Sequence, residues 1–393
     1  MKVLHVIPSV SLAHGGPSQA IRTMERVLAD QGIHVETATT DDDGPGCRMS
    51  SPKIVLLEGN EKIRRRYFRK NTEFYKCSWS FGRWILQRVR DYDLVQVHAL
   101  FSFTSVIAAL AARAAGVPYV VRPLGTLEDY GLRNRRPLLK KLSLYCLEGP
   151  IIRHAAAVHF TSTAEQQQAE ALGYPIRSAV IPLALNSLDL PPAPSLDALL
   201  PETTGSRIVL FLSRLDPKKN VEGLVHAFSK VAREVPMLHL VIAGSGEGAY
   251  VGTLKQQAAR LGIASRISWP GYVDGDLKAA LFQGATVFVL PSYSENFGIA
   301  VAEALAASLP CIVGRGVALA RQIEAAEAGL CVGTGPADIA AGLRQVFLSE
   351  ERRAVMARNA RALAVAQFSG AVMGQRMRAL YESILINRKE VRG

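Results

Sequence analysis

The chain of 393 residues has few cysteines and no long uninterrupted apolar run. Its five cysteines are scattered, and none belongs to a C-x-x-C pair, which disfavours both a metal centre and a disulfide framework. We therefore expect reduced thiols and a cytoplasmic protein. The longest apolar stretch, Val106–Val121, is interrupted by Arg113 and stays below the roughly 18 residues that span a membrane. The segment Met1–Ile7 is too short and polar for a signal peptide and is predicted to be a strand.

Acidic residues are fewer than basic ones. The chain has 34 Asp and Glu and 46 Lys and Arg, which gives a net charge of +12. The imbalance is greatest in residues 62–90, where ten basic residues accompany the single acid Glu73. Aromatic residues alternate with these basic ones, and a second basic stretch covers residues 133–141. Such patterns favour an anionic membrane surface or a phosphate-bearing acceptor. A solvated basic face and nucleic-acid binding are the alternatives.

Short apolar runs alternate with helical patterns, which predicts an α/β fold with parallel sheets. The first strand series is expected at Val3–Ile7, His34–Thr39, Leu94–His98, Tyr119–Arg122, Val158–Thr161 and Ala179–Ile181. Proline-rich and polar residues over 191–206 indicate a linker. A second series follows at Arg207–Leu212, Leu238–Ala243, Ile267–Trp269, Thr286–Leu290, Pro310–Val313 and Leu330–Val332.

The two series predict two Rossmann-like, doubly wound domains that face a central cleft. The first domain covers residues 1–190 and the second covers residues 207–368. A C-terminal helix in 369–393 has no strand after it, so we expect it to pack back on the first domain.

The most informative motif follows the predicted strand Thr286–Leu290. A turn containing Glu295 and Gly298 leads into a helix whose first turns contain Glu303. Free backbone N–H groups at the start of a helix form an anion site. Two carboxylates beside an anion site suggest a ligand that is both charged and rich in hydroxyl groups, such as a nucleotide-sugar.

Cations and glycines follow other predicted strands. Arg214 and Lys219 lie just beyond Arg207–Leu212, where they could neutralise a diphosphate. An ordinary surface pair of cations is the alternative. Gly244, after Leu238–Ala243, allows a ligand to come close, although no complete dinucleotide fingerprint is present.

In the first half, Gly15 and Gly16 follow the first strand, and His98 ends the third predicted strand. The glycines allow close approach of a ligand, or else form a simple tight turn. His98 stands where a ligand would bind an open α/β sheet, or else has a structural role.

Taken together, these motifs resemble those of the family 4 glycosyltransferases, which have the GT-B fold. The resemblance covers nearly the whole chain and includes the E-x7-E pair Glu295 and Glu303 and the segment Ser213–Lys219. It also includes Gly15-Gly16, Val97-His98, Arg122–Gly125, Ala243-Gly244 and Gly271–Val273. Four positions depart from the family pattern: Ser213, Asn220 and Ser308 replace glycines, and Pro182–Asn186 replaces a proline-asparagine-glycine or proline-histidine-glycine motif.

The resemblance implies a role for each motif residue. Glu303 would hold the donor ribose, Glu295 a hydroxyl of the donor sugar, and Arg214 and Lys219 the diphosphate. The backbone of Asn296, Phe297, Gly298 and Ile299 would meet the sugar and diphosphate. The other implied contacts are Gly15 and Gly16 near the diphosphate, Gly244 near the donor, Tyr272 and Val273 near the base, His98 beside sugar and acceptor, and Arg122 and Gly125 at the acceptor. His98, Arg214, Lys219 and Glu295 are the expected catalytic group.

The expected reaction is retaining transfer of a hexosyl group from a nucleotide-sugar, with UDP preferred and GDP second, to a saccharide or lipid-linked saccharide in polysaccharide biosynthesis. No Asp-x-Asp motif follows a suitable strand, since Asp41–Asp43 lies in a polar loop, so we expect neither metal nor cofactor. The basic segments 62–90 and 133–141 would contact an anionic membrane, on the inner face of the plasma membrane, and no nucleic-acid partner is expected. A nucleotide-sugar epimerase and a non-catalytic nucleotide-sugar binding protein are the alternative functions.

Overall fold

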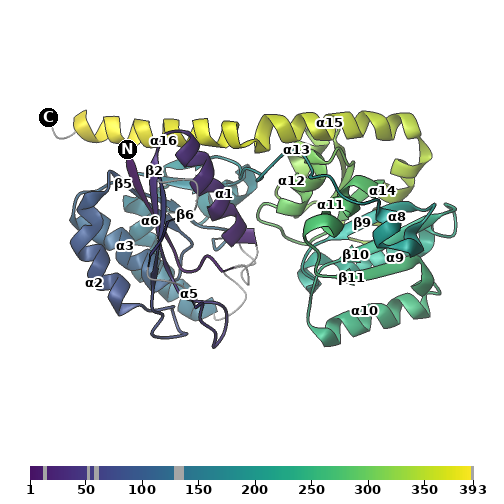
Figure 1. Ribbon diagram of the computed structural model, residues 1–393, viewed down its shortest axis with the longest axis horizontal. Helices are drawn as coiled ribbons and strands as arrows, with labels where there is room; N and C mark the ends of the chain where they lie inside the picture. The colour runs from purple at the N-terminus through teal and green to yellow at the C-terminus, as the bar shows by residue number, and fades with distance from the viewer. Residues whose placement is uncertain (12–15, 51–53, 57–61, 128–136, 391–393) are drawn as a thin grey trace. The chain divides into compact units, whose positions relative to one another are not determined.

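The computed structural model describes residues 1–11, 16–50, 54–56, 62–127 and 137–390. The chain divides into two compact units (Figure 1). Unit 1 comprises Met1–Asn186 and Gly370–Gly393, and unit 2 comprises Ser187–Ser369. Each unit has its own largely parallel sheet flanked by helices, which confirms the predicted α/β class.

The sheet of unit 1 has the strand order β3-β4-β2-β1-β5-β6-β7-β8. Its strands are β1 (Lys2–Ile7), β2 (His34–Thr40), β3 (Ile54–Leu56), β4 (Ile63–Phe68), β5 (Leu94–His98), β6 (Tyr119–Arg122), β7 (Ala157–Phe160) and β8 (Ser178–Val180). Among the strand pairs that the structure describes in this unit, only the pairing of β3 with β4 is antiparallel. Since β1 lies between β2 and β5, the strand order reverses there, and ligands of such sheets bind at the carboxyl ends of the strands near this point.

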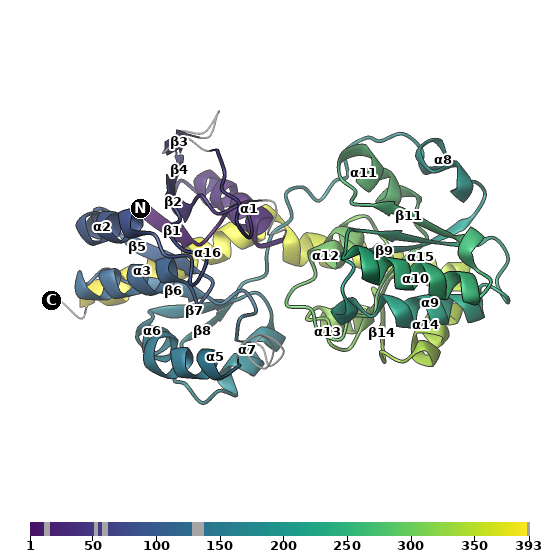
Figure 2. The same cartoon turned by 90° about the horizontal axis from the view of Figure 1, so that it is seen from below.

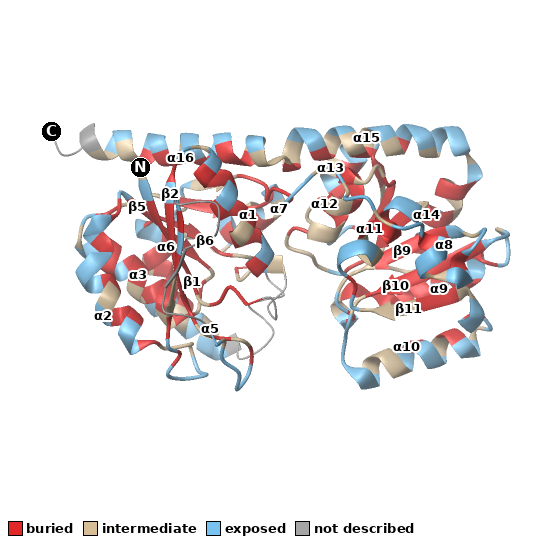
Figure 3. Ribbon diagram, viewed as in Figure 1, coloured by how far each residue is buried: buried red, intermediate tan, exposed pale blue. Residues whose placement is uncertain are grey.

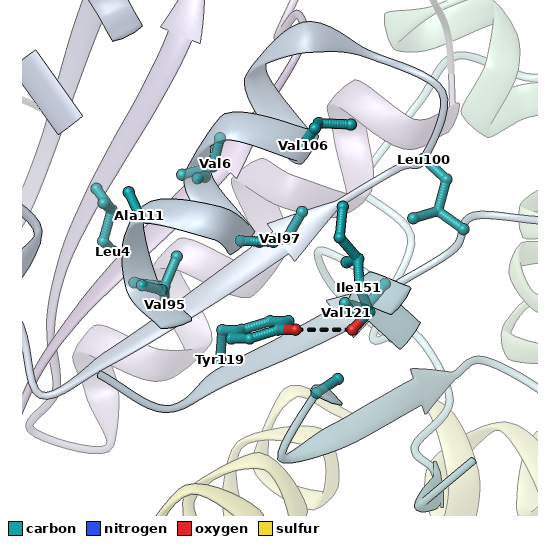
Figure 4. Packing of buried hydrophobic residues seen from close by; sticks show 14 of the residues in the cluster. Leu4, Val6, Val95, Val97, Leu100, Val106, Ala111, Tyr119, Val121 and Ile151 are labelled. Atoms are coloured by element: carbon teal, nitrogen blue, oxygen red, sulfur yellow. Dashed lines mark hydrogen bonds between the residues drawn. The ribbon is translucent and has the colours of Figure 1, made fainter. Parts of the chain in front are cut away.

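Helices cover both faces of this sheet: α1 (Gly16–Asp30), α2 (Trp79–Arg88), α3 (Phe103–Ala114), α5 (Pro137–Ser143), α6 (Gly149–His154), α7 (Thr163–Glu170) and α16 (Gly370–Glu390). A π-helical turn, Leu144–Glu148, joins α5 to α6. On one face, Leu4, Val6, Val95 and Val97 pack with α3, and the Tyr119 hydroxyl donates to the Ile151 carbonyl over 2.8 Å (Figure 4). On the other face, α1 and α16 cover a core that includes Met373, Met377 and Tyr381.

The basic segment 62–90 does not form one surface, which corrects the sequence prediction. Its first part is the unpredicted strand β4, and Arg65 on this strand is buried in an ion pair with Glu25 of α1. Lys70 is buried as well, and its Nζ lies 2.5 Å from Asp42 Oδ1. Glu25 and Asp42 lie outside the segment, so a count of charges within residues 62–90 overlooks them. The loop 41–43 therefore contributes a structural carboxylate.

The sheet of unit 2 is entirely parallel, with the order β11-β10-β9-β12-β13-β14. Its strands are β9 (Arg207–Leu212), β10 (Leu238–Ala243), β11 (Ile267–Gly271), β12 (Val287–Leu290), β13 (Cys311–Gly314) and β14 (Gly329–Val332). The central strands are buried on both faces, as their continuous apolar runs predict (Figure 3). The strand order reverses at β9, between β10 and β12, so the loops that follow β9 and β12 form the expected ligand edge.

The helices of unit 2 are α8 (Leu196–Leu199), α9 (Val221–Val231), α10 (Gly248–Arg260), α11 (Gly275–Gly284), α12 (Ile299–Ala306), α13 (Ala320–Ala325), α14 (Pro336–Leu348) and α15 (Glu350–Phe368). Figure 2 shows α9, α10 and α14 gathered on this sheet. The segment predicted as a linker contains α8, and the buried Leu196 packs against Gly284 of α11. This apolar contact makes residues 191–206 part of unit 2.

Candidate functional site

The loops that follow β9 and β12 lie side by side at the carboxyl edge of the second sheet. Lys219 Nζ, on the first loop, forms an ion pair with the Glu295 carboxylate on the second. The backbone joins the loops too, because Tyr293 N donates to Lys218 O over 3.0 Å. The structure thus brings together two residues that the sequence places 76 positions apart.

Local sequence explains how each member of this pair is held. Asp216 accepts a hydrogen bond from Lys218 N over 2.9 Å and begins a short 3-10 turn, which ends at Asn220 in a left-handed conformation. On the other loop, Glu295 N donates to Gly316 O over 2.9 Å, and Ala318 N donates to Glu295 O over 3.0 Å. Both charged side chains therefore project from fixed backbone.

The start of α12 adjoins Glu295. Gly298 is the N-cap residue, with φ of 82° and no side-chain capping bond, so it leaves the first N–H groups of the helix to other partners. Phe297 is buried, and its ring packs edge-on against Phe368 of α15 at 5.6 Å between ring centroids. The predicted backbone segment Asn296–Ile299 is therefore anchored from inside, and its helix dipole favours an anion in front of it.

Glu303 has a lysine partner of its own. Its Oε1 lies 2.7 Å from Lys278 Nζ on α11, and both side chains are about one-quarter exposed (22% and 25%). Each glutamate of the E-x7-E pair is therefore balanced by a separate cation. Sequence reasoning missed Lys278, because nothing in its own helix distinguishes it from a surface lysine.

Arg214 is exposed in the loop that follows β9, and a neighbouring loop holds this part of the chain in place. Ser213 N donates to Ala243 O over 3.1 Å, and Leu215 N donates to Ser245 O over 2.8 Å. A Cβ atom on Gly244, whose φ is 140°, would lie 1.8 Å from Ser213 O. Glycine is therefore required at position 244 because the backbone of Ser213 lies so close to it. The sequence prediction had explained this glycine by a close contact with a ligand.

The residues predicted near the nucleotide base differ from each other in exposure. Tyr272 is 72% exposed, whereas the Val273 side chain is buried. Only Tyr272 presents its side chain to solvent, next to Gly271, which has a φ of 74°.

His98 and Arg122, which were predicted beside the sugar and the acceptor, lie in the interior of unit 1. His98 Nε2 lies 3.1 Å from His5 Nδ1, and Arg122 Nη1 lies 3.5 Å from His98 Nδ1. Burial, followed by the nearby Arg122 charge, lowers the pKa of His5 to about 3, and burial lowers the pKa of Arg122 to about 10. Both predicted residues face α16, where the Tyr381 hydroxyl donates to Gln96 over 3.1 Å. That helix comes from the far end of the chain, which is why the strand pattern did not predict their burial.

Of the three glycines predicted to bind a ligand in unit 1, the structure describes Gly16 and Gly125. Gly16 is the first residue of α1, and Gly15 lies outside the described residues. Gly125 has a φ of 73°, and its N–H donates to Glu165 Oε1 over 2.8 Å. Glu165 is buried, and burial raises its pKa. This carboxylate, which fixes the turn that follows β6, was not among the predicted residues.

Within the described ranges, no group of three or more His, Cys, Asp or Glu side chains could hold a metal ion.

Two family models match the chain, one in each half. Residues 15–184 match the glycosyl transferase 4-like domain, and residues 197–363 match glycosyl transferases group 1. The chain is 26% identical to a phosphatidyl-myo-inositol mannosyltransferase of Mycolicibacterium smegmatis, over 98% of this chain and 94% of that protein. It is 28% identical to a D-inositol 3-phosphate glycosyltransferase of Streptomyces scabiei, over 76% and 70% respectively.

Solved structures share the fold. Sucrose-phosphate synthase from Thermosynechococcus elongatus has a TM-score of 0.79 at 18% identity, covering 98% of this chain and 100% of that one. Anabaena HepE in complex with UDP and glucose has a TM-score of 0.76 at 19% identity, with the same coverage. With both halves matched in order and two parallel-sheet units present, the chain belongs to the family 4-like glycosyltransferases with the GT-B fold.

Proposed function

We propose that this glycosyltransferase moves a hexosyl group, with retention of configuration, from a nucleotide-sugar to a saccharide or lipid-linked saccharide in polysaccharide biosynthesis. UDP-sugars are the first choice of donor and GDP-sugars the second. The observation that carries this proposal is the Lys219–Glu295 ion pair beside the uncapped start of α12. It places a cation, a carboxylate and a helix dipole at one sheet edge. The structural neighbour from Anabaena was crystallised with UDP-glucose, which supports the choice of UDP.

Each charged residue has a proposed task during transfer. Arg214 and Lys219 neutralise the diphosphate as its bond to the anomeric carbon breaks. Glu295 accepts hydrogen bonds from the donor sugar, Glu303 accepts them from the ribose, and the N–H groups at the start of α12 bind phosphate oxygens. The acceptor oxygen forms the new bond on the same face of the anomeric carbon, and its proton passes to the leaving diphosphate. This scheme requires no metal ion.

A thermal-shift panel of UDP-, GDP- and TDP-sugars tests the donor proposal. A ligand at 100 times its dissociation constant stabilises the folded protein by about 2.7 kcal/mol, so the true donor raises the melting temperature clearly. The absence of a shift with every sugar nucleotide would contradict the proposed donor class. Incubation of the best donor without acceptor then separates the alternatives, because an epimerase converts the sugar moiety whereas a glycosyltransferase does not.

The Glu303→Ala variant is expected to bind the nucleotide about tenfold more weakly, because a charged acceptor of ribose hydroxyl hydrogen bonds is lost. Calorimetric titration with UDP measures this change. Glu324→Ala, which removes a carboxylate from α13 in the same unit, is the matched control and should bind normally. Equal affinity of wild type and Glu303→Ala would rule out the ribose contact.

We further propose that unit 1 contacts anionic membranes through residues 74–88 and 137–147. Phe74 and Trp79 are 64% and 63% exposed, and Leu138 and Leu142 are 80% and 61% exposed. The two segments are neighbours, because the Tyr75 hydroxyl lies 2.9 Å from Ser143 Oγ. Lys140 and Lys141 add positive charge between the exposed leucines. Of the second predicted basic stretch, residues 133–136 lie outside the described residues.

We expect the protein to bind vesicles that contain anionic phospholipid, and we expect added salt to weaken this binding. Binding to vesicles of neutral phosphatidylcholine should be slight. Changing Leu138 and Leu142 to Ser should reduce sedimentation with anionic vesicles several-fold, because apolar insertion is lost. Leu348→Ser, which alters an 83% exposed leucine of unit 2, is the control and should bind like wild type. Equal binding to neutral and anionic vesicles would contradict the electrostatic part of the proposal. Within the described part of the chain, none of the helices has the length and hydropathy to cross a bilayer.

A further inference from the structure

Asn220 occupies the position between Lys219 and α9 where the family pattern has glycine. Its backbone has φ of 56° and ψ of 44°, the left-handed conformation that glycine adopts freely and that asparagine tolerates better than most residues. The residue is only 3% exposed. A glycine would satisfy the backbone here, so the asparagine side chain adds something that the turn alone does not need.

The Asn220 amide joins three segments of unit 2. Its Nδ2 donates to Pro291 O over 3.2 Å and to Thr334 O over 2.8 Å. Its Oδ1 accepts from the Tyr293 hydroxyl over 3.1 Å. Pro291 and Tyr293 follow β12, and Thr334 follows β14, so one buried side chain ties together the carboxyl ends of two strands. Buried polar groups with all their hydrogen bonds made fix a single arrangement.

The first turn of α9 leaves space for this amide. A Cβ atom on Gly223 would lie 2.4 Å from Asn220 Oδ1, so a side chain at position 223 and the amide cannot share that space. The φ of Gly223 lies outside the left-handed region, so the glycine is needed for space and not for its backbone conformation.

The segments that Asn220 joins are those that carry the Lys219–Glu295 pair. Lys219 is its neighbour in the chain, and Glu295 lies in the loop that Asn220 holds at Pro291 and Tyr293. We propose that Asn220 is a positioning residue, whose amide holds Lys219 and Glu295 in the geometry that receives the diphosphate and sugar of the donor. This proposal rests on the proposed function, which assigns the pair to donor binding.

The Asn220→Gly variant tests the proposal, because glycine keeps the left-handed backbone and removes only the amide. Calorimetry with UDP and with uridine separates diphosphate binding from nucleoside binding; GDP and guanosine take their place if the donor panel selects guanine. We expect UDP affinity to fall about tenfold, as for a displaced binding group, with uridine affinity unchanged. A parallel loss of both affinities, or no loss of either, would overturn the positioning role. Failure of the wild type to bind UDP or GDP would instead overturn the proposed function.

Position 223 supplies an independent test. Gly223→Ala alone should displace the amide, weaken UDP binding and lower the melting temperature. In the Asn220→Gly background the same methyl group has room, and alanine favours a helix more than glycine does, so the double variant should melt no lower than Asn220→Gly alone. An equal penalty for Gly223→Ala in both backgrounds would contradict the proposed place of the amide.

Tyr293→Phe covers the case in which Asn220→Gly fails to fold. It deletes one hydroxyl from a side chain that is 56% exposed, so the fold should survive. UDP binding should weaken several-fold with uridine binding intact, since the amide loses one of its three partners. UDP binding at the wild-type level in this variant would count against the proposal.

Discussion

Arg214→Ala and Lys219→Ala should each slow sugar transfer by at least about 100-fold, the scale that follows removal of one preorganised group from a developing negative charge. Lys219 is the stronger case, because it is buried and fixed against Glu295. Its loss also leaves the Glu295 carboxylate without its cation, next to the place where the diphosphate would bind. Repulsion between these two anions adds to the barrier.

The measurement is the initial rate of sugar transfer with the donor selected by the thermal-shift panel. The buffer contains EDTA, so the same assay also tests whether transfer requires a metal ion. Lys230→Ala is the matched control, because this exposed lysine lies in the last turn of α9, away from the loop that carries Lys219. Normal turnover by both Arg214→Ala and Lys219→Ala would exclude the diphosphate role. Loss of wild-type activity in EDTA would show that a metal ion takes part.

The Gly244→Ala variant should lower the free energy of unfolding of unit 2 by at least about 3 kcal/mol. Two causes act together: a φ of 140° strains any other residue, and the new Cβ atom would lie 1.8 Å from Ser213 O. Small backbone shifts cannot easily remove this clash, because hydrogen bonds hold both segments. Gly244 N donates to Gly271 O over 2.7 Å, and Ser213 N donates to Ala243 O over 3.1 Å. The loop that carries Arg214 moves if the clash is relieved, so activity should fall as well.

Denaturant unfolding followed by circular dichroism measures this loss. Gly252→Ala is the control, since a Cβ atom on Gly252, within α10, would meet nothing within 4 Å. Alanine should stabilise that helix by about 0.5–1 kcal/mol, so the two glycine substitutions have effects of opposite sign. A Gly244→Ala protein as stable as the wild type would show that the two loops are not packed as described.

Local sequence was enough to predict the strands of unit 2 that precede the loops with Lys219 and Glu295. Continuous apolar runs identify β9 and β12 as buried strands, and Lys219 and Glu295 were placed in the loops after them, where ligands of such sheets bind. The pairing of β9 with β12, which brings the two loops together, comes from the structure. Direct contact between their side chains was not expected, because it depends on the turn at Asn220 and on the bridge from Glu295 to Val317.

Unit 1 was harder to predict, because its important partners are distant in the sequence. β4 contains Arg64, Arg65 and Arg66 in a row, a pattern that suggests surface charge. Arg65 can be buried because Glu25 pairs with it, and Arg66 Nε lies 3.0 Å from Glu36 Oε1. Both acids are distant from β4 in the sequence. For His98, the alternation of side chains along β5 places it on the same face as Gln96 but does not say what covers that face.

The covering of that face by α16 has a consequence for biosynthesis. Unit 1 consists of two chain segments, and all of unit 2 is translated between them. When residue 369 has been added, every residue of unit 2 has been synthesised, while unit 1 still lacks the helix that supplies Met373, Met377 and Tyr381 to its core. Unit 2 is therefore one continuous segment, whereas unit 1 needs residues from both sides of it. Until α16 packs, the part of the sheet face that Tyr381 covers at Gln96 is open to water, and to chaperones that recognise exposed apolar surface.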